Sequence, residues 1–306
     1  MGIFIITREG MVLTVWNSVY SQRKKIFELF ESILSASPTF PNAKSRRWSR
    51  LFHGSLLCVY FYILIVSILM TSLLNYSDAK DYIYITLFGI IVEESSHMVV
   101  FILYFAFNSY LLIVPSVASF TYVYVCCQLR RMLKLCHQRL KKCRSFEEIE
   151  HIFQQATDLM FVIKKTEDSL SVCAFFVIAF NLILSFTSLY YGLGYYVTRA
   201  SITAGVVAWL FSNQMSFIII CLTASNVLNE VMDLKTAFQI ILCNFNQSES
   251  TLNMFFQRLA VLDSVSLTGW KMFNLSKGLI LSAFGSILTY GLLVLQTLNY
   301  KDPQIV

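Results

Sequence analysis

The last apolar run of the chain constrains its fold more than any other feature. Between Ser276 and Leu298 the only charge is Lys277, near the start, and the run is long enough to cross a bilayer as an α-helix. Six of its residues recur at intervals of three and four, so they fall on one narrow face of that helix. They are Ser282, Gly285, Ser286, Thr289, Leu293 and Gln296.

Two roles fit such a mostly small and polar stripe. A wettable face on a spanning helix can line a pore when several copies meet around an axis. Small residues at the same spacing also let neighbouring membrane helices approach closely. The spacing alone favours close packing.

The rest of the chain also has the composition of a membrane protein. Of its 306 residues, 56% are hydrophobic and only 14% are charged, and the mean hydropathy is +0.62, which is too apolar for a soluble globular protein. Five runs are long enough to span a bilayer. They are 51–74, 98–127, 171–197, 202–227 and 276–298. The sequence therefore predicts an all-α, polytopic membrane bundle.

A shorter apolar stretch, 82–92, ends at Glu93 and Glu94 and is too brief to cross a bilayer. We interpret it as an outer extension or re-entrant piece before the second span, because a separate span here would invert every later loop. Glu93, Glu94 and His97 could form a cation-attracting or proton-sensitive vestibule. A solvated helix end is the commoner reading of such a cluster, and we favour it.

The distribution of basic residues predicts the orientation. All but three of the 24 Lys and Arg residues, the exceptions being Lys80, Arg199 and Lys301, fall in segments that are cytosolic if the N-terminus is inside. Because cytosolic loops are enriched in Lys and Arg, we expect a cytosolic N-terminus, an extracellular C-terminus and a plasma-membrane location. The expected segments are a cytosolic N-terminal segment 1–50, two spans with an outer extension 51–127, cytosolic amphipathic helices 128–170, the third and fourth spans 171–227, cytosolic helices 228–275, the last span 276–298 and an outer tail 299–306.

The two long cytosolic segments are predicted to be amphipathic helices and not linkers. Apolar residues recur there at helical spacing, for example at Leu129, Leu133, Ile152, Leu234 and Phe238. Such faces bury themselves on one another or on neighbouring subunits, or lie on the inner leaflet. We favour packing, because the helices of 228–275 carry few basic residues.

The cysteines and histidines indicate no disulfide or metal chemistry. All eight cysteines fall in cytosolic segments or inner halves of spans, so we expect reduced thiols that fill packing space. No Cys and His spacing is typical of a metal site, and no catalytic grouping appears, so we expect no enzyme, no cofactor and no nucleic-acid partner. Of the glycosylation sequons, Asn75 is expected in an outer loop, where it could be glycosylated, whereas those at Asn246 and Asn274 are expected in the cytosol or at the inner interface.

The end of the last run resembles a known family. Thr289-Tyr290, five residues and then Gln296 are similar to the C-terminal TY-x5-Q signature of the arthropod gustatory receptors, which are relatives of the insect odorant receptors. The approach through 267–273, with Gly278 following, is also similar to that family's. The resemblance covers about residues 3 to 299. It implies a seven-helix receptor-channel whose third to seventh helices match the five spans, with 1–50 as the tail of the second helix plus a loop, so that the chain is N-terminally truncated.

The resemblance also implies a function. Family members are chemosensory receptor subunits that act as ligand-gated, non-selective cation channels, with four identical or related copies arranged around the last helix. The face from Ser282 to Gln296 would line the pore, with Leu293 at a hydrophobic constriction and Gln296 in a polar ring, while Tyr290 packs between subunits. The implied partners are a small-molecule tastant, the permeating cations, membrane lipid and related receptor subunits.

Ligand contacts are expected among polar and aromatic residues in the outer halves of the spans, a combination that suits sugars or bitter compounds. The candidates are Asn108, Tyr110, Tyr190, Tyr191, Trp209 and Asn213. Tyr190 and Tyr191 also suit an aromatic belt at the membrane interface, and Asn213 with Gln214 suits a hydrogen bond to a neighbouring helix.

Other classes of function were weighed against the channel. A truncated, non-conducting subunit could modulate full-length receptors. A G-protein-coupled receptor would need seven spans, an outer N-terminus and usually an outer disulfide, which the charge distribution and the cysteine positions oppose. A transporter normally carries charged residues at mid-membrane depth, and the central thirds of the five spans have none.

Overall fold

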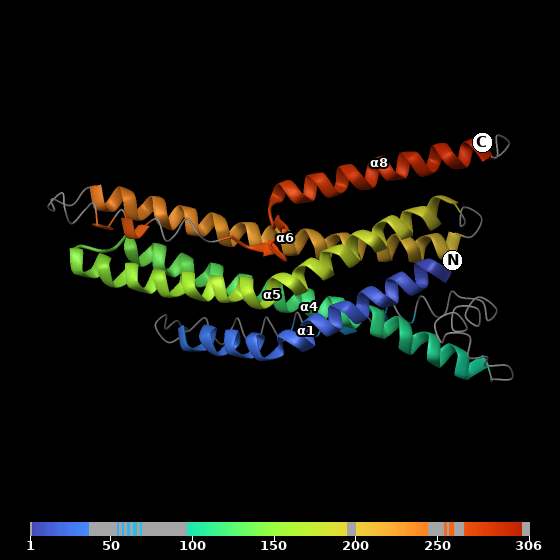
Figure 1. The fold of residues 1–306 in the computed structure, drawn as a ribbon, viewed down its shortest axis with the longest axis horizontal. Coiled ribbons are helices and arrows are strands. Elements are labelled where there is room, and N and C mark those ends of the chain that lie inside the picture. Colours follow the sequence, from blue (N-terminus) through green and yellow to red (C-terminus); the bar gives the residue numbers. More distant parts are fainter. Residues whose placement is uncertain are drawn as a thin grey trace.

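The computed structural model is almost entirely helical, and it describes residues 2–36, 97–194, 200–243 and 266–301 with separate positions in 54–68 and 254–259. The elements run in the order α1 Gly2–Ala36, α4 His97–Leu140, α5 Phe146–Gly194, α6 Ala200–Cys243, β1 Thr268–Gly269, β2 Phe273–Asn274 and α8 Lys277–Lys301 (Figure 1). The two short strands form an antiparallel hairpin directly before α8. The predicted all-α membrane fold is confirmed.

Within the described residues, four helical segments are long and apolar enough to cross a membrane. They are Ser109–Leu140, Phe146–Leu189, Asn213–Cys243 and Lys277–Thr297. They overlap four of the five expected spans. The expected span 51–74 lies mostly outside the described residues, and so do the stretch 82–92, the Glu93-Glu94 pair and Asn75. His97 is the first residue of α4.

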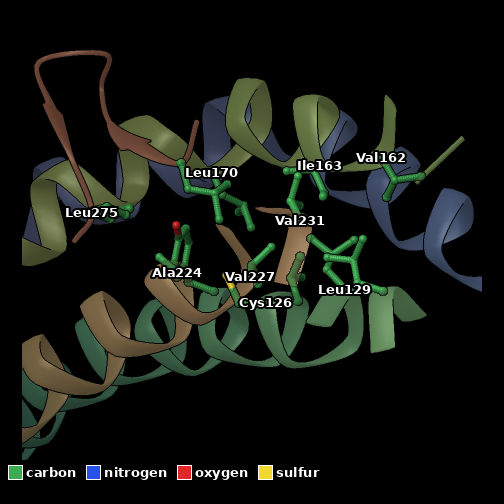
Figure 2. Packing of buried hydrophobic residues seen from close by; sticks show 14 of the residues in the cluster. Cys126, Leu129, Val162, Ile163, Leu170, Ala224, Val227, Val231 and Leu275 are labelled. Atoms are coloured by element: carbon green, nitrogen blue, oxygen red, sulfur yellow. The ribbon is translucent and has the colours of Figure 1, made fainter. Parts of the chain in front are cut away.

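Three helices are about twice as long as a bilayer requires. α4, α5 and α6 contain 44, 49 and 44 residues, whereas about 20 residues suffice to cross the hydrocarbon core. They pack together through the amphipathic faces seen in the sequence. Figure 2 shows Leu129 of α4, Ile163 of α5 and Val231 of α6 in one buried cluster. The apolar faces of these helices are thus buried on one another.

Aromatic and charged pairs hold this part of the helix bundle together. Phe153 of α5 meets Phe238 of α6 edge to face, with ring centroids 5.5 Å apart, and lies 4.7 Å from the ring of Phe255. Such aromatic pairs add about 0.5–1.5 kcal/mol each beyond area burial. Arg130 and Lys134 of α4 both lie 3.3 Å from a carboxylate oxygen of Glu230 on α6.

The first helix, α1, is continuous over 35 residues and packs along α5 and α4, within the segment 1–50 where we expected the tail of a helix and a loop. The hydroxyl of Ser169 on α5 lies 3.5 Å from the carbonyl oxygen of Lys25, and the ammonium of Lys165 lies 2.9 Å from the hydroxyl of Ser32. The basic run of α1 therefore lies beside the basic run of α5.

α1 begins at the same end of the molecule at which α8 ends (Figure 1). The cytosolic N-terminus and the extracellular C-terminus expected from the basic residues stay predictions. Arg8 and Glu9 within α1 hid its length from a hydropathy reading.

We expect Phe238→Ala to destabilise the helix bundle, because the ring is fully buried and loss of a buried Phe costs about 3–5 kcal/mol. The thermal midpoint of the detergent-purified protein, followed by size-exclusion chromatography after heating, should fall by several degrees. Ile240→Ala is the matched control, since this side chain on the same helix is 59% exposed. Equal effects of the two substitutions would contradict this packing.

Candidate pore helix and its anchor

One face of α8 packs against its own chain. Ala283 and Val294 are buried, and the ring of Tyr290 meets that of Phe186 on α5 edge to face at 5.0 Å. Gly291 lies so close to α5 that an added Cβ would stand 2.9 Å from a methyl carbon of Leu189. This seam of small residues and one aromatic ring joins α8 to α5, and α8 also contacts α6.

The stripe predicted from the sequence lies on a different face. All six of its residues, from Ser282 to Gln296, are exposed, and Leu293 is 54% exposed. At about 100° per residue the stripe is centred roughly 140° around the helix from the packing seam. The polar stripe and the close-packing seam are therefore two separate features of α8.

The hydroxyls of the stripe present acceptor atoms outward. Ser286 donates its proton to the carbonyl oxygen of Ser282 at 3.0 Å, and Thr289 donates to that of Gly285 at 2.9 Å. A hydroxyl has only one proton to donate, so each oxygen keeps only acceptor capacity for whatever occupies the space beside the helix. Such a surface suits a cation or the oxygen-bound shell of water around it.

A third face of α8 is apolar and also uncovered. It consists of Leu281, Phe284, Leu288, Leu292 and Leu295, which are between 36% and 76% exposed. These side chains follow one another at three- and four-residue spacing between the seam and the stripe. In a membrane such a face meets lipid or a neighbouring protein.

A hairpin anchors the start of α8 to α5. The carboxylate of Glu167 accepts hydrogen bonds from both the backbone N–H of Thr268, at 2.8 Å, and the Thr268 hydroxyl. The Thr268 hydroxyl oxygen in turn accepts from the N–H of Lys271 at 3.0 Å, and the N–H of Trp270 donates to the carbonyl oxygen of Ser171 at 3.0 Å. Trp270 and Lys271 complete the tight turn with φ of 47° and 58°.

The base of the hairpin belongs to the hydrophobic core. Leu267 and Leu275 are fully buried, and the N–H of Leu275 donates to the carbonyl oxygen of Leu267 at 2.9 Å. Figure 2 shows Leu275 pointing into the cluster that also holds Leu170 of α5 and Ala224 of α6. The chain thus enters α8 directly from the core, with no flexible joint between them.

Glu167 is a charged group held in a buried place. It lies in the 164–168 run of charges, outside the apolar part of α5. Burial raises the pKa of its carboxyl, and the hydrogen bonds from Thr268 oppose that rise. Sequence reasoning missed its role; the only available signal was an acid directly before an apolar run, since its partner lies 101 residues away.

The sequence-derived ligand candidates are only partly described. Asn213 is buried on α6, and Tyr110 on α4 is 38% exposed. Asn108, Tyr190, Tyr191 and Trp209 lie on described helices, but their side chains fall outside the described residues.

A polar cluster does lie between α5 and α6. Gln214 donates to the hydroxyl of Ser185, which donates to the carbonyl oxygen of Asn181 at 2.7 Å. The amide nitrogen of Asn181 and the amide oxygen of Gln214 are buried and have no hydrogen-bond partner among the described residues. The expected helix-to-helix bond near Asn213 is present at Gln214, whereas Asn181 and Ser185 were not foreseen.

The cysteines of the described residues form no disulfide. The seven cysteines within the described residues are all free thiols, and Cys136 is fully buried. No group of three or more potential metal ligands occurs among the described residues.

Comparison with known proteins finds no match to the sequence but does find a match to the fold. Neither a protein-family model nor a curated protein matches the sequence. The fold does match a solved structure, that of the insect olfactory receptor OR5 from Machilis hrabei in complex with eugenol, with a TM-score of 0.69 and 15% identity. The match covers 96% of this chain and 80% of that one.

The chain has the fold of an insect olfactory receptor. A second structure of the same receptor gives a TM-score of 0.68, again at 15% identity with 96% and 80% of the two chains covered. At this identity the likeness establishes the fold alone. This olfactory-receptor fold accounts for the order of long helices that ends in α8.

We expect Glu167→Gln to loosen the hairpin, because loss of charge-assisted hydrogen bonds from a buried carboxylate costs about 1.5–3 kcal/mol. Amide hydrogen exchange measured by mass spectrometry in peptides covering 266–276 should speed up by about tenfold or more. The neighbouring Asp168→Asn should leave exchange unchanged, since the Asp168 side chain is 53% exposed. Unchanged exchange in Glu167→Gln would show that the carboxylate does not hold the hairpin.

Proposed function

We propose that this chain is a subunit of a chemosensory receptor that conducts cations when a small molecule binds, with four copies arranged around the polar stripe of α8. The observation that carries the proposal is the exposure of that stripe on the side away from the seam. A stripe used for close packing within the chain would lie against α5 or α6, where Ala283 and Gly291 already fill that role. Lining a shared aqueous path is the role left for the stripe.

The chemistry of the stripe suits a gated cation path. The hydroxyl oxygens of Ser286 and Thr289 offer acceptors and no protons, which favours cations over anions. Four Leu293 side chains brought together would form an apolar ring that excludes water when it is narrow. Four Gln296 amides beside it would replace part of an ion's hydration without a strong choice among cations. The path would be non-selective.

The assembly would use the faces that a single chain leaves uncovered. A ring of four follows from one heterologous contact repeated around an axis. The apolar face from Leu281 to Leu295 would cover the edge of the neighbouring subunit or meet lipid, and the partners would be identical or related chains. The receptor would lie in the plasma membrane, with Asn75 glycosylated on the outside.

The gustatory branch is proposed on the TY-x5-Q string at Thr289, Tyr290 and Gln296. The ligand would be a tastant bound in the outer half of the bundle, near Asn108, Tyr110, Tyr190, Tyr191, Trp209 and Asn213. Because Asn213 is buried beside the polar cluster of α5 and α6, a ligand there would act on the two helices that α8 packs against. That arrangement supplies a direct route from binding to the pore.

Leu293→Ser should make the channel leaky, because a hydroxyl ring no longer excludes water from the constriction. We expect basal current to rise several-fold in voltage-clamped cells with G-protein signalling blocked. Leu292→Ser is the matched control: Leu292 is 62% exposed but belongs to the apolar face. A silent Leu293→Ser at normal surface expression would oppose the pore assignment and favour a non-conducting, modulatory subunit.

Asn213→Ala should shift ligand potency without changing unitary conductance, because Asn213 lies on α6 and away from the stripe of α8. Sugars and bitter compounds are suitable first ligands, with dose–response curves and single-channel recordings as the two readouts. A change of conductance with unchanged potency would remove Asn213 from the ligand site.

A further inference from the structure

A cavity of about 540 Å³ lies between α1, α5 and the turn of the hairpin. Three lysines from three separate elements line it: Lys25 of α1, Lys165 of α5 and Lys271 of the hairpin turn. Gln22 and Trp270 also contribute to the wall. The cavity is within the size range of small-ligand sites, and none of the proposed channel parts of α8 enters it.

The cavity lies where the charged part of α5 gives way to the apolar run predicted to span the membrane. Its α5 wall spans the step from the charged residues Lys165 and Asp168 to the apolar run that begins after Ser171. On α1 the run Arg23-Lys24-Lys25 marks the same level. Under the positive-inside rule such basic steps mark the cytosolic interface, so the cavity faces the headgroups of the inner leaflet.

The ion pairs of two of these lysines are long and exposed, although Lys165 also donates hydrogen bonds to the Ser32 hydroxyl at 2.9 Å and to the Glu28 carbonyl oxygen at 3.2 Å. Lys271 lies 3.8 Å from Asp168, and Lys165 lies 4.0 Å from the Glu28 carboxylate; both acids are more than half exposed. Ion pairs that exposed contribute little, so a stronger anion can displace them. The ammonium of Lys25 makes no hydrogen bond or ion pair with any residue that the structure describes.

Two further groups in the cavity wall indicate that its ligand carries more than an anionic group. The amide oxygen of Gln22 is buried and has no hydrogen-bond partner among the described residues, so it can accept from a hydroxyl. The Trp270 indole is 50% exposed and packs on the rings of Phe175 and Phe176 at 5.4 and 5.8 Å. Tryptophan is enriched at the headgroup level of membranes.

We propose that this cavity binds the headgroup of an anionic inner-leaflet phospholipid, one that carries both phosphate and hydroxyl groups, as an inositol phospholipid does. Lys25, Lys165 and Lys271 contact the phosphate oxygens as charge-assisted donors, and Gln22 accepts from a headgroup hydroxyl. Basic pockets between helices on the cytosolic side suit such headgroups. The acyl chains continue along the apolar part of α1 and α5.

The site would couple lipid to the pore helix. Lys271 and Trp270 belong to the turn whose backbone is bonded to Thr268 and Ser171, and that hairpin leads straight into α8. A bound headgroup therefore adds contacts between the hairpin and α1. Lipid binding at this cavity is separate from the proposed channel function, so the binding test gives an answer whether or not the chain conducts.

The test is a binding titration on the full chain purified in a neutral detergent. Short-chain phosphatidylinositol phosphate is the probe, with short-chain phosphatidylcholine as the neutral lipid, and native mass spectrometry counts the bound molecules. The double variant Lys25→Gln with Lys271→Gln should weaken probe binding by about tenfold or more, as expected for two lysines near a membrane surface. Phosphatidylcholine binding should not change.

The matched control is Lys24→Gln with Lys164→Gln, which removes the same charge from lysines outside the cavity wall. Equal weakening in both double variants would mean general surface attraction and overturn the proposal. Equally tight binding of soluble inositol bisphosphate or inorganic phosphate would identify a site for a free phosphate and overturn the lipid assignment. Unchanged thermal midpoints of both variants confirm that folding is intact.

Discussion

The carboxylate of Glu167 joins a hairpin 101 residues further along the chain to α5, and the place of the last helix depends on this contact. α5 is the central helix of the molecule, since it contacts α1, α4, α6, α8 and β1. Because Leu267 and Leu275 are fully buried at the base of the hairpin, α8 is fixed at its start and largely uncovered along its length. The hydrophobic core, the hairpin and α8 with its polar stripe are therefore directly connected.

Much of the fold could be read from the sequence, because helical periodicity is a local property. The faces of 128–140 and 228–243 were visible at three- and four-residue spacing, and burial of Leu129, Leu133, Leu234 and Phe238 follows it. The stripe from Ser282 to Gln296 was visible for the same reason. What spacing did not give was the seam through Gly291, which depends on where Leu189 of another helix comes close.

The features that the sequence concealed depend on contacts between distant segments. Thr268 gives no local sign that it will bond Glu167, and Asn181 gives none that it will lie beside Ser185 and Gln214. The full length of α1 was not predicted for a different reason. Arg8 and Glu9 lower the hydropathy of this segment, although α1 is one continuous helix that packs on α5. In both cases a contact between two elements decided the structure, and no short stretch of sequence contains both partners of that contact.

The uncovered state of α8 has a consequence for how the protein matures. Only 17% of its most apolar window is buried within the chain, against 56% for α5, so most of the favourable contacts of α8 come from lipid or from other copies. In the tetramer proposed above, the contacts of α8 with other copies would form by mass action, so its stability would depend on subunit concentration. Sparse expression would then leave folded cores with unpaired last helices, and abundance in the membrane would rise steeply once assembly begins.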